Sequence, residues 1–369
     1  MRILIYSHYF HPSVGGVEKT TLLLARYLSE TGHETTVITQ TPSDREDAWS
    51  FRVVRTPRTR ELLSLIRQAE VVQIQGFVFL PFFIAKVLGR PVVWAHHGYD
   101  ITCPKQIGWN DDKDTYFQLS QCMACLRRDH SMGESIGLVV LLAAKRFFKG
   151  FADAHVAPSH YLLTREALKG IVIPNPVDAG LYTPSNRARE TGKILFMGRL
   201  IEEKGVDVLI DAMGILAGGG HDYSLEIVGT GHKHTYLRNL VRAKGLEDRI
   251  SFSPPLFDNE LVDRIQRASV VAAPTISAEA FGMVGIEAMS CETPLVATRK
   301  GGFPEFAEGV AWLVPTGDAA ALAEALENAI TDNGLSGRLH LGRLRILERY
   351  DFRKVGESYI RLYETVLSR

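Results

Sequence analysis

The stretch SAEAFGMVGIEAMSCETP, residues 277–294, places two glutamates eight positions apart around a Phe-Gly pair. The apolar run SVVAAPT before it is typical of a buried strand, and VGIEAMS has helical spacing. We therefore expect Glu279 in a loop at the carboxyl end of a strand. Glu287 should lie one turn into a helix that begins at Gly282 or Met283.

The start of this expected helix has the chemistry of an anion site. The first backbone amides of a helix lack partners within the helix, and here they belong to Phe281, Gly282 and Met283. If a phosphate binds there, a carboxylate lies on either side of it. These carboxylates would repel other anions and accept hydrogen bonds from neutral hydroxyl groups, such as those of a sugar and a ribose. The alternative is a helix with one capping acid and one exposed acid.

A second group of charges lies in GRLIEEKG, residues 198–205. Arg199 and Lys204 should lie in a loop after a strand and before a helix, where both cations can converge on one diphosphate without a metal ion. Because Glu202 and Glu203 lie between them, a solvated charged turn is the alternative.

Two further polar clusters follow strand-like runs in the first half of the chain. Gly15 and Gly16 join the first strand to the first helix, where adjacent glycines present amides to a ligand or form a tight turn. The segment PVVWAHHGYD contains His96, His97 and Asp100, and a polar cluster at the carboxyl end of a strand often faces a cleft. We expect His96 to pack or cap, and a structural role is the alternative for His97.

The cysteines suggest a different kind of site. Cys103, Cys122, Cys125 and His130 have the ligand types of a structural zinc site, which would staple a polar loop. The alternative is free or transiently oxidised thiols. No catalytic role is implied for these residues.

The composition excludes several classes of protein. The chain has 369 residues with 42 Lys and Arg against 42 Asp and Glu, so no net field recruits nucleic acid or an anionic membrane. The N-terminal apolar run is too short for a signal peptide, and no run approaches the roughly 18 apolar residues of a membrane span. We expect a cytoplasmic protein with reduced thiols. Residues 136–151, IGLVVLLAAKRFFKGF, would cover a core or form an amphipathic surface, weakly associated with the inner face of a membrane.

Strand-like and helix-like patterns alternate along the chain. RILIYS, VEKTTLLLARYLSE and ETTVIT form a βαβ unit, and the alternation restarts with KILFM after a linker at 174–192. Further strands are expected at VVQIQ, PVVWA, SLEIVG, RISFS, SVVAAP, PLVAT and AWLV. Since this length favours two domains, we expect two open α/β domains with a ligand at the carboxyl ends of the strands.

Together these segments resemble the retaining glycosyltransferases of the large family 4, the glycosyl transferases group 1. Beside the acid-Phe-Gly-acid signature, the motifs HPSVGGVEKTTLLLARYLSETGHETTVIT, VAPSHYL, VIPNPVD, GRLIEEKGVDVLIDA, LEIVGTG and GGFPEF occur in the family's order. At Glu292 the family usually has a glycine. The resemblance implies the GT-B fold, in which two Rossmann-like domains face each other across a cleft. Residues 1–175 would bind the acceptor and 176–350 the nucleotide sugar, and the C-terminal helix 351–369 would pack back on the first domain.

By position, the resemblance also implies roles for the residues named above. His97 and Glu279 would contact the donor sugar, Arg199 and Lys204 would bind the diphosphate, and these four would be catalytic. Glu287 would bind the ribose. The other donor-binding positions would be Gly15, Gly16, Gly198, Gly229, Ala280, Phe281, Gly282, Met283 and Val284.

The implied reaction is transfer of a hexosyl or N-acetylhexosaminyl group from a UDP-sugar to an acceptor hydroxyl, with retention and without a metal. Because the matched motifs contain no evident nucleophile, we expect same-face substitution. The acceptor, oriented by Asp100, would be a small molecule, a lipid-linked molecule or a glycan, and the enzyme a monomer or dimer. The alternatives are a GT-B-fold epimerase or phosphorylase, and a catalytically silent sugar-nucleotide-binding regulator.

Two other motifs resemble sites of a different kind. GTGHKH lacks the third glycine of a dinucleotide site, which makes NAD binding a weak alternative, and the acids at 110–114 are interpreted as solvated and not as metal ligands.

Overall fold

The computed structural model describes residues 1–13, 15–44, 48–105, 119–332 and 334–369. The chain divides into two compact units. Unit 1 comprises Met1–Pro176 and Phe352–Arg369, and unit 2 comprises Val177–Asp351. The sequence places these boundaries after residues 175 and 350.

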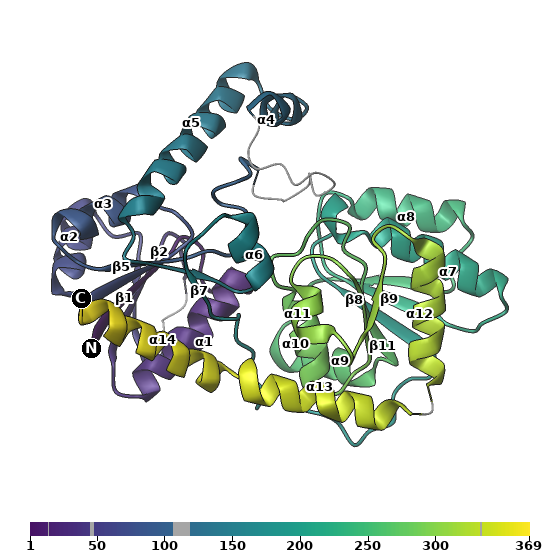
Figure 1. Cartoon of the computed structure of the whole chain (residues 1–369). Helices are drawn as coiled ribbons and strands as arrows, with labels where there is room; N and C mark the ends of the chain where they lie inside the picture. Colours follow the sequence, from purple (N-terminus) through teal and green to yellow (C-terminus); the bar gives the residue numbers. More distant parts are fainter. Residues whose placement is uncertain (14, 45–47, 106–118, 333) are drawn as a thin grey trace. The chain divides into compact units, whose positions relative to one another are not determined.

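Unit 1 is built on a parallel sheet with the strand order β3-β2-β1-β4-β5-β6-β7 (Figure 1). The strands are β1 Arg2–Ser7, β2 Glu34–Thr39, β3 Arg52–Arg55, β4 Val71–Gln75, β5 Val92–Ala95, β6 Ala154–Ala157 and β7 Ile171–Val172. The helices are α1 Gly16–Glu30, α2 Thr59–Gln68, α3 Phe79–Val87, α4 Leu119–Leu126, α5 Met132–Phe148, η1 Lys149–Phe151, α6 His160–Arg165 and α14 Phe352–Leu367.

The two faces of this sheet form separate cores because successive side chains of a strand point to opposite faces. In β1, Ile3 and Ile5 pack with α1 and α14, whereas Leu4 and Tyr6 pack with α2 and α3. Both faces are therefore covered by helices, which explains why the strands read as nearly continuous apolar runs.

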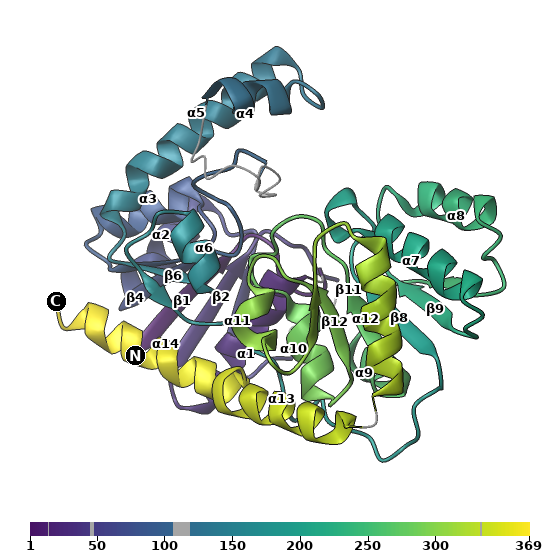
Figure 2. The same ribbon diagram turned by 45° about the vertical axis from the view of Figure 1, so that its right-hand side comes forward.

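Unit 2 repeats this architecture with the strand order β10-β9-β8-β11-β12-β13 (Figure 2). Its strands are β8 Lys193–Met197, β9 Ser224–Val228, β10 Ile250–Ser253, β11 Val270–Ala273, β12 Leu295–Thr298 and β13 Trp312–Val314. Its helices are η2 Glu202–Lys204, α7 Val206–Gly218, α8 His234–Ala243, α9 Asp258–Arg267, α10 Met283–Ser290, α11 Phe303–Ala307, α12 Ala319–Thr331 and α13 Leu335–Arg349.

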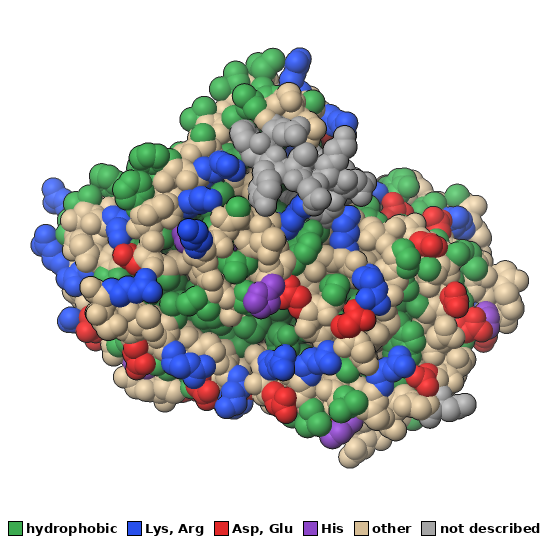
Figure 3. Space-filling model, in the orientation of Figure 1, with side chains coloured by type: hydrophobic (Ala, Val, Ile, Leu, Met, Phe, Trp, Pro, Cys, Tyr) green, Lys and Arg blue, Asp and Glu red, His purple; other side chains and the backbone are tan. Residues whose placement is uncertain are grey.

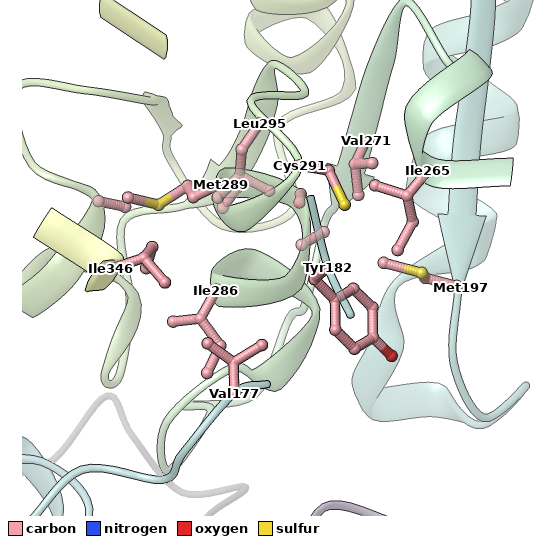
Figure 4. Close-up of a cluster of buried hydrophobic side chains, with 14 of the residues drawn as sticks. Val177, Tyr182, Met197, Ile265, Val271, Ile286, Met289, Cys291, Leu295 and Ile346 are labelled. Carbon is pink, nitrogen blue, oxygen red and sulfur yellow. The ribbon is translucent and has the colours of Figure 1, made fainter. Parts of the chain in front are cut away.

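One face of the second sheet packs against α10 and α13. Figure 4 shows the side chains of this core, in which Met197 and Val271 of the sheet lie with Ile286 of α10 and Ile346 of α13. The opposite face packs against α7 and α12. The sheet thus holds α10, the helix of the acid-Phe-Gly-acid stretch, directly against its core.

The α/β class and the alternation of strands and helices are confirmed in both units. The pattern did not reveal β3, β6 and β7, of which β3 and β7 are the edges of the sheet and β6 lies next to β7. The expected C-terminal helix is α14, which lies beside α1 in unit 1 and buries Tyr359 and Tyr363. No helix in the described ranges is both long enough and apolar enough to span a membrane.

Candidate active site

The strand order of unit 2 reverses at β8, which lies between β9 and β11. At such a reversal the loops that follow two neighbouring strands diverge, and ligands of open α/β sheets bind in the crevice that they leave. The loop after β8 carries Arg199 and Lys204, and the loop after β11 carries Glu279. The topology therefore brings these two loops to the same edge of the sheet.

Lys204 and Glu279 form an ion pair at this edge. The Lys204 Nζ lies 2.6 Å from the Glu279 Oε2, and the two side chains are 22% and 23% exposed. The turn that contains Lys204 is attached to the segment after β11, since the amide of Ile276 donates to the carbonyl oxygen of Glu203 at 2.9 Å. Two loops far apart in the sequence thus hold opposite charges together.

The two glycines of GGFPEF hold the Glu279 loop from its other side. The amide of Gly302 donates to the carbonyl oxygen of Glu279 at 2.8 Å. Gly301 has a φ of 68°, and a Cβ there would lie 2.2 Å from the same oxygen. No residue with a side chain fits at Gly301, so this motif positions the carboxylate.

Helix α10 begins at Met283, as the sequence predicts, and Gly282 precedes it with a φ of 103°. Because Gly282 has no side chain, it leaves the first amides of the helix without a side-chain cap. Ala280, Met283 and Val284 are partly exposed around this terminus. The Phe281 ring is buried in the core, so Phe281 can offer only its backbone to a ligand.

Glu287 lies one turn into α10, as expected, and is only 3% exposed. Its carboxylate is hydrogen-bonded to the Tyr182 hydroxyl, and burial together with this carboxylate raises the pKa of Tyr182 well above its ordinary value. Burial and the same carboxylate raise the pKa of the Cys291 thiol to about 12. The phenol therefore stays protonated and donates a hydrogen bond to the Glu287 carboxylate. Figure 4 shows Tyr182 and Cys291 in the apolar cluster.

Gly198 and Gly229 follow β8 and β9 directly. A Cβ on Gly229, whose φ is 148°, would lie 1.9 Å from the carbonyl oxygen of Gly198, so these backbones meet without room for a side chain. Arg199 is exposed beside them and makes no ion pair with any residue that the structure describes. Its guanidinium is available to a ligand at this edge.

In unit 1, His97 lies just after β5 and beside the end of β4. Its Nε2 lies 2.6 Å from the Oε1 of Gln75. Burial lowers the pKa of His97 to about 4, and a hydrogen bond with the Asn175 side chain acts in the opposite direction. The imidazole is therefore uncharged at neutral pH and donates its Nε2 proton to Gln75.

His96 packs inside unit 1, as the sequence analysis expects. It stacks on Trp94, with ring centroids 4.8 Å apart, and its Nε2 lies 3.0 Å from the Nδ1 of His155. Burial lowers the pKa of His96 well below the ordinary value, and the nearby His155 lowers it further. The adjacent histidines thus have separate surroundings.

Asp100 lies in a buried cluster with Lys145 and Glu166. The Lys145 Nζ and the Asp100 Oδ1 are 3.8 Å apart, and both side chains are 8% exposed. Glu166 accepts hydrogen bonds from the amide of Ile101, at 2.5 Å, and from the hydroxyl of Thr102. Burial raises the pKa of Asp100 and raises that of Glu166 to about 7. This cluster anchors α5 to the start of the loop after β5.

Gly15 and Gly16 lie at the N-terminus of α1. Gly15 is the residue before the helix, and Gly16 is its first residue. Gly15 has an extended backbone with a φ of −169°, and an added Cβ would meet only the flexible carboxylate of Glu18. Gly15 is therefore not required by a left-handed turn.

The zinc site considered from the sequence is not supported. Within the described ranges, which include Cys103, Cys122, Cys125 and His130, no three His, Cys, Asp or Glu side chains are arranged to hold a metal ion. The Lys105 ammonium instead lies between Cys125 and Asp129. The positive charge beside the Cys125 thiol thus belongs to a lysine side chain. The acidic run at 110–114 lies outside the described residues.

Sequence reasoning missed several side chains that support the candidate residues, namely Gln75, Lys145, Glu166, Asn175 and Tyr182. The motifs VVQIQ and VIPNPVD contain two of them, and a polar residue at the end of a buried strand could have drawn attention to Gln75. Tyr182 and Glu287 are distant in sequence, and no pattern connects them.

Comparisons with known proteins agree with this geometry. The family model for glycosyltransferase family 4 matches residues 14–181, and that for glycosyl transferases group 1 matches residues 183–341. The phosphatidyl-myo-inositol mannosyltransferase of Mycobacterium leprae is 37% identical over 47% of this chain and 46% of its own. The D-inositol 3-phosphate glycosyltransferase of Arthrobacter sp. strain FB24 is 33% identical over 54% of this chain and 50% of its own. The matches thus span about half the length of these curated relatives.

Solved structures share the fold over the whole chain. The structure of Anabaena HepE, in complex with UDP and glucose, superposes with a TM-score of 0.75 at 18% identity and covers 99% of this chain and all of its own. Both sheets thus match a GT-B structure. With the two family models matching adjacent segments, the chain belongs to glycosyltransferase family 4 and has the GT-B fold.

Proposed function

We propose that this protein is a retaining glycosyltransferase, which transfers a sugar from a nucleoside diphosphate, most simply UDP, to an acceptor hydroxyl. Unit 2 binds the donor in this proposal, and unit 1 binds the acceptor. The named curated relatives are a mannosyltransferase and an inositol phosphate glycosyltransferase, and the solved relative is a complex with UDP and glucose.

The observation that carries the proposal is the arrangement of charges at the carboxyl edge of unit 2. The Lys204–Glu279 pair, the exposed Arg199 and the first turn of α10 lie on loops that follow adjacent strands. Cations and helix amides suit a diphosphate, and carboxylates suit neutral hydroxyl groups. Glu287, held by Tyr182, takes the ribose, and Glu279 takes the sugar.

The chemistry follows from the charge that develops as the sugar leaves. The bond between the anomeric carbon and the diphosphate oxygen breaks, and the departing oxygen gains negative charge. Arg199, Lys204 and the amides near Gly282 stabilise this charge and do so without a metal ion. The acceptor oxygen then bonds to the same face of the sugar, and the diphosphate oxygen takes its proton.

The neutral His97 supplies a different contribution in unit 1. Because the Gln75 side chain accepts a hydrogen bond from the Nε2 of His97, the imidazole has a fixed tautomer and orientation. An uncharged ring can form hydrogen bonds with sugar hydroxyls without attracting the diphosphate. Inositol phosphates and lipid-linked inositols are suitable first acceptors to try, in view of the names of the curated relatives.

A donor panel tests the proposal. Thermal shift with UDP-glucose, UDP-galactose, UDP-N-acetylglucosamine and GDP-mannose should single out one donor, since a ligand of the folded state raises its stability. Release of UDP should require both donor and acceptor and should survive excess EDTA. The coupling constant of the anomeric proton should show an α-linked product from an α-linked donor, and a β-linked product would refute retention.

The same experiment separates the alternatives. An epimerase would change the sugar nucleotide without any acceptor, and a phosphorylase would need phosphate. A regulator would bind the donor and release no nucleotide with any acceptor of the panel.

A further inference from the structure

The helix α3 of unit 1 exposes a stripe of large apolar side chains. Phe79, Leu80, Phe83 and Val87 are 49%, 45%, 49% and 67% exposed. Their spacing of one, three and four residues places them on one side of the helix. The other side of α3, including Phe82, is buried in the core of unit 1. This helix is therefore apolar on both its sides.

The helix α5 has a second stripe of the same kind. Met132, Ile136, Val140 and Phe147 are 49%, 50%, 61% and 66% exposed, and their spacing of four, four and seven residues aligns them along the helix. Phe151, just after the helix, is 51% exposed. A helix of a water-soluble protein ordinarily presents polar residues on such a side.

The two stripes meet through aromatic side chains. The ring of Phe148 lies 5.2 Å from that of Phe79 and 6.1 Å from that of Phe151, measured between centroids. Phe147 in turn lies 5.4 Å from Phe151. The exposed apolar residues of α3, α5 and Phe151 thus form one surface, which we call the α3–α5 face. Figure 3 shows hydrophobic side chains gathered over these helices.

The charges around the α3–α5 face have one predominant sign. Residues 77–99 and 135–152 contain no Asp or Glu, and the one acid of α5, Glu134, is bonded to Ser131 at the start of the helix. They contain Lys86, Arg90, Lys145, Arg146 and Lys149, of which Lys145 is buried in the cluster with Asp100. Asp153 balances Lys86, at 2.8 Å between the Nζ and the Oδ2. Arg90, Arg146 and Lys149 remain beyond these pairs, so the rim of the apolar surface has a net positive charge.

We propose that the α3–α5 face docks on a membrane surface that contains anionic lipids. Exposed Phe, Leu, Ile and Val side chains enter the boundary between headgroups and acyl chains, and the basic rim pairs with lipid phosphates. A second copy of the chain fits less well, because a symmetric contact would bring the same basic rims together. This proposal goes beyond sugar transfer and does not depend on it.

Vesicle co-sedimentation of the full chain tests this proposal. Vesicles of phosphatidylcholine alone are compared with vesicles of phosphatidylcholine and phosphatidylglycerol in equal parts. We expect the wild-type chain to bind the anionic vesicles at least roughly tenfold more tightly, with weaker binding in high salt. The double variant Phe83→Glu/Phe147→Glu should lose roughly tenfold or more of this binding.

The variant Ile215→Glu is the matched control. Ile215 is 48% exposed on α7 of unit 2, outside the α3–α5 face, so its replacement should leave vesicle binding unchanged. Circular dichroism and the melting temperature show whether each variant is folded. Because Phe83, Phe147 and Ile215 are 49%, 66% and 48% exposed, the double variant and the control should both be folded. A second double variant, Leu80→Gln/Val140→Gln, repeats the test with neutral side chains.

Three outcomes would overturn the proposal. One is equal binding of the wild type and both folded double variants, and another is absence of binding to anionic vesicles. The third is a wild-type dimer in light scattering that the double variants convert to a monomer, without vesicle binding, which would make the face a contact between copies. Binding needs no donor, so a chain that binds vesicles but transfers no sugar would refute only the proposed function.

Discussion

The candidate residues of the two units differ in how they treat charge. In unit 2, Lys204, Glu279 and Arg199 are charged and at least partly exposed, at the loops that follow β8 and β11. In unit 1, burial holds His97 neutral at pH 7 and raises the pKa of Glu166 to about 7. Two sheets of similar architecture therefore present opposite chemistry beside their strands.

This difference fits a division of labour in the proposed reaction. A diphosphate carries the charge of the donor, so it needs cations and amides. Hydroxyl groups of a sugar or acceptor are neutral, so buried dipoles such as Gln75 and Asn175 suit them better than ions. On this basis, removing a charge in unit 2 should lower activity. In unit 1, a group that burial holds neutral should make stability depend on pH.

The largest effect is expected for Lys204→Ala in unit 2. This variant removes the cation proposed for the diphosphate and leaves Glu279 without its partner, so donor use should weaken by about 2 to 4 kcal/mol. The corresponding fall in kcat/KM for the donor is about thirtyfold or more. Steady-state kinetics with a varied donor concentration measure it.

Lys244→Ala is the control for that change, because Lys244, just after the C-terminal end of α8, pairs with Asp211 of α7 at 2.8 Å in the same unit, away from the carboxyl ends of β8 and β11. It should keep its activity. Wild-type kinetics in the Lys204 variant would remove Lys204 from the diphosphate site.

Two further changes divide the charged edge of unit 2. Glu279→Gln should lower kcat about tenfold and leave UDP affinity equal or higher, because Lys204 is released from its pair. Glu287→Gln should instead weaken UDP binding about tenfold, since a buried carboxylate that would accept from the ribose is lost. Calorimetry with UDP and turnover measurements separate the two effects. The assignment fails if both variants alter the same parameter.

The neutral side of the comparison is tested by stability against pH. Glu166 has a pKa of about 7 in the folded chain against an ordinary value of 4.5. Because the folded state prefers the protonated form, stability is complete below about 4.5 and is lost as the pH rises through 7. The variant Glu166→Gln lacks this loss, so its stability relative to wild type should rise by about 2 kcal/mol between pH 5 and pH 8.

Thermal or denaturant unfolding at both pH values measures this change in relative stability. Glu61→Gln, at an exposed position of α2, is the control and should show no such trend. A constant difference between Glu166→Gln and wild type would mean that Glu166 is ionised throughout.

The smallest predicted effect concerns Tyr182→Phe. This change removes the hydroxyl that donates to Glu287 and leaves the ring in its apolar cluster. UDP affinity should fall about fivefold, near 1 kcal/mol, while kcat at saturating donor stays the same. Tyr359→Phe, another buried phenol but in unit 1, should not alter UDP binding. Unchanged affinity in Tyr182→Phe would show that Glu287 does not depend on this hydrogen bond.

The elements that position the charged edge could be read from the sequence because their determinants are local. The period of the apolar residues predicted the strands, and the Phe-Gly pair predicted the start of α10 at Met283. The glycine that the family usually has at Glu292 also has a local meaning, since Glu292 adopts a φ of 54° in the turn after α10. A left-handed backbone conformation in such a turn depends on the few residues around it in the chain, so it can be read from the sequence.

Contacts across long separations could not be predicted in this way. The Lys204–Glu279 pair joins residues 75 positions apart, and the sequence analysis assigns both to ligands and not to each other. The Tyr182 hydroxyl and the buried position of Asp100 depend on packing, which a single sequence does not encode in any visible period. Cys122 and Cys125 had suitable spacing for zinc, but the Lys105 ammonium next to Cys125 is a three-dimensional fact.

The discontinuity of unit 1 has a consequence for synthesis of the chain. Its core contains Val355, Tyr359 and Tyr363 of α14, and the Tyr363 hydroxyl donates to Gln73 of β4. A ribosome makes these residues only after the whole of unit 2 has been translated. Unit 2 can therefore complete its core first, whereas unit 1, begun earlier, waits with an uncovered sheet face for the last helix. The first unit to be started is the last to be finished.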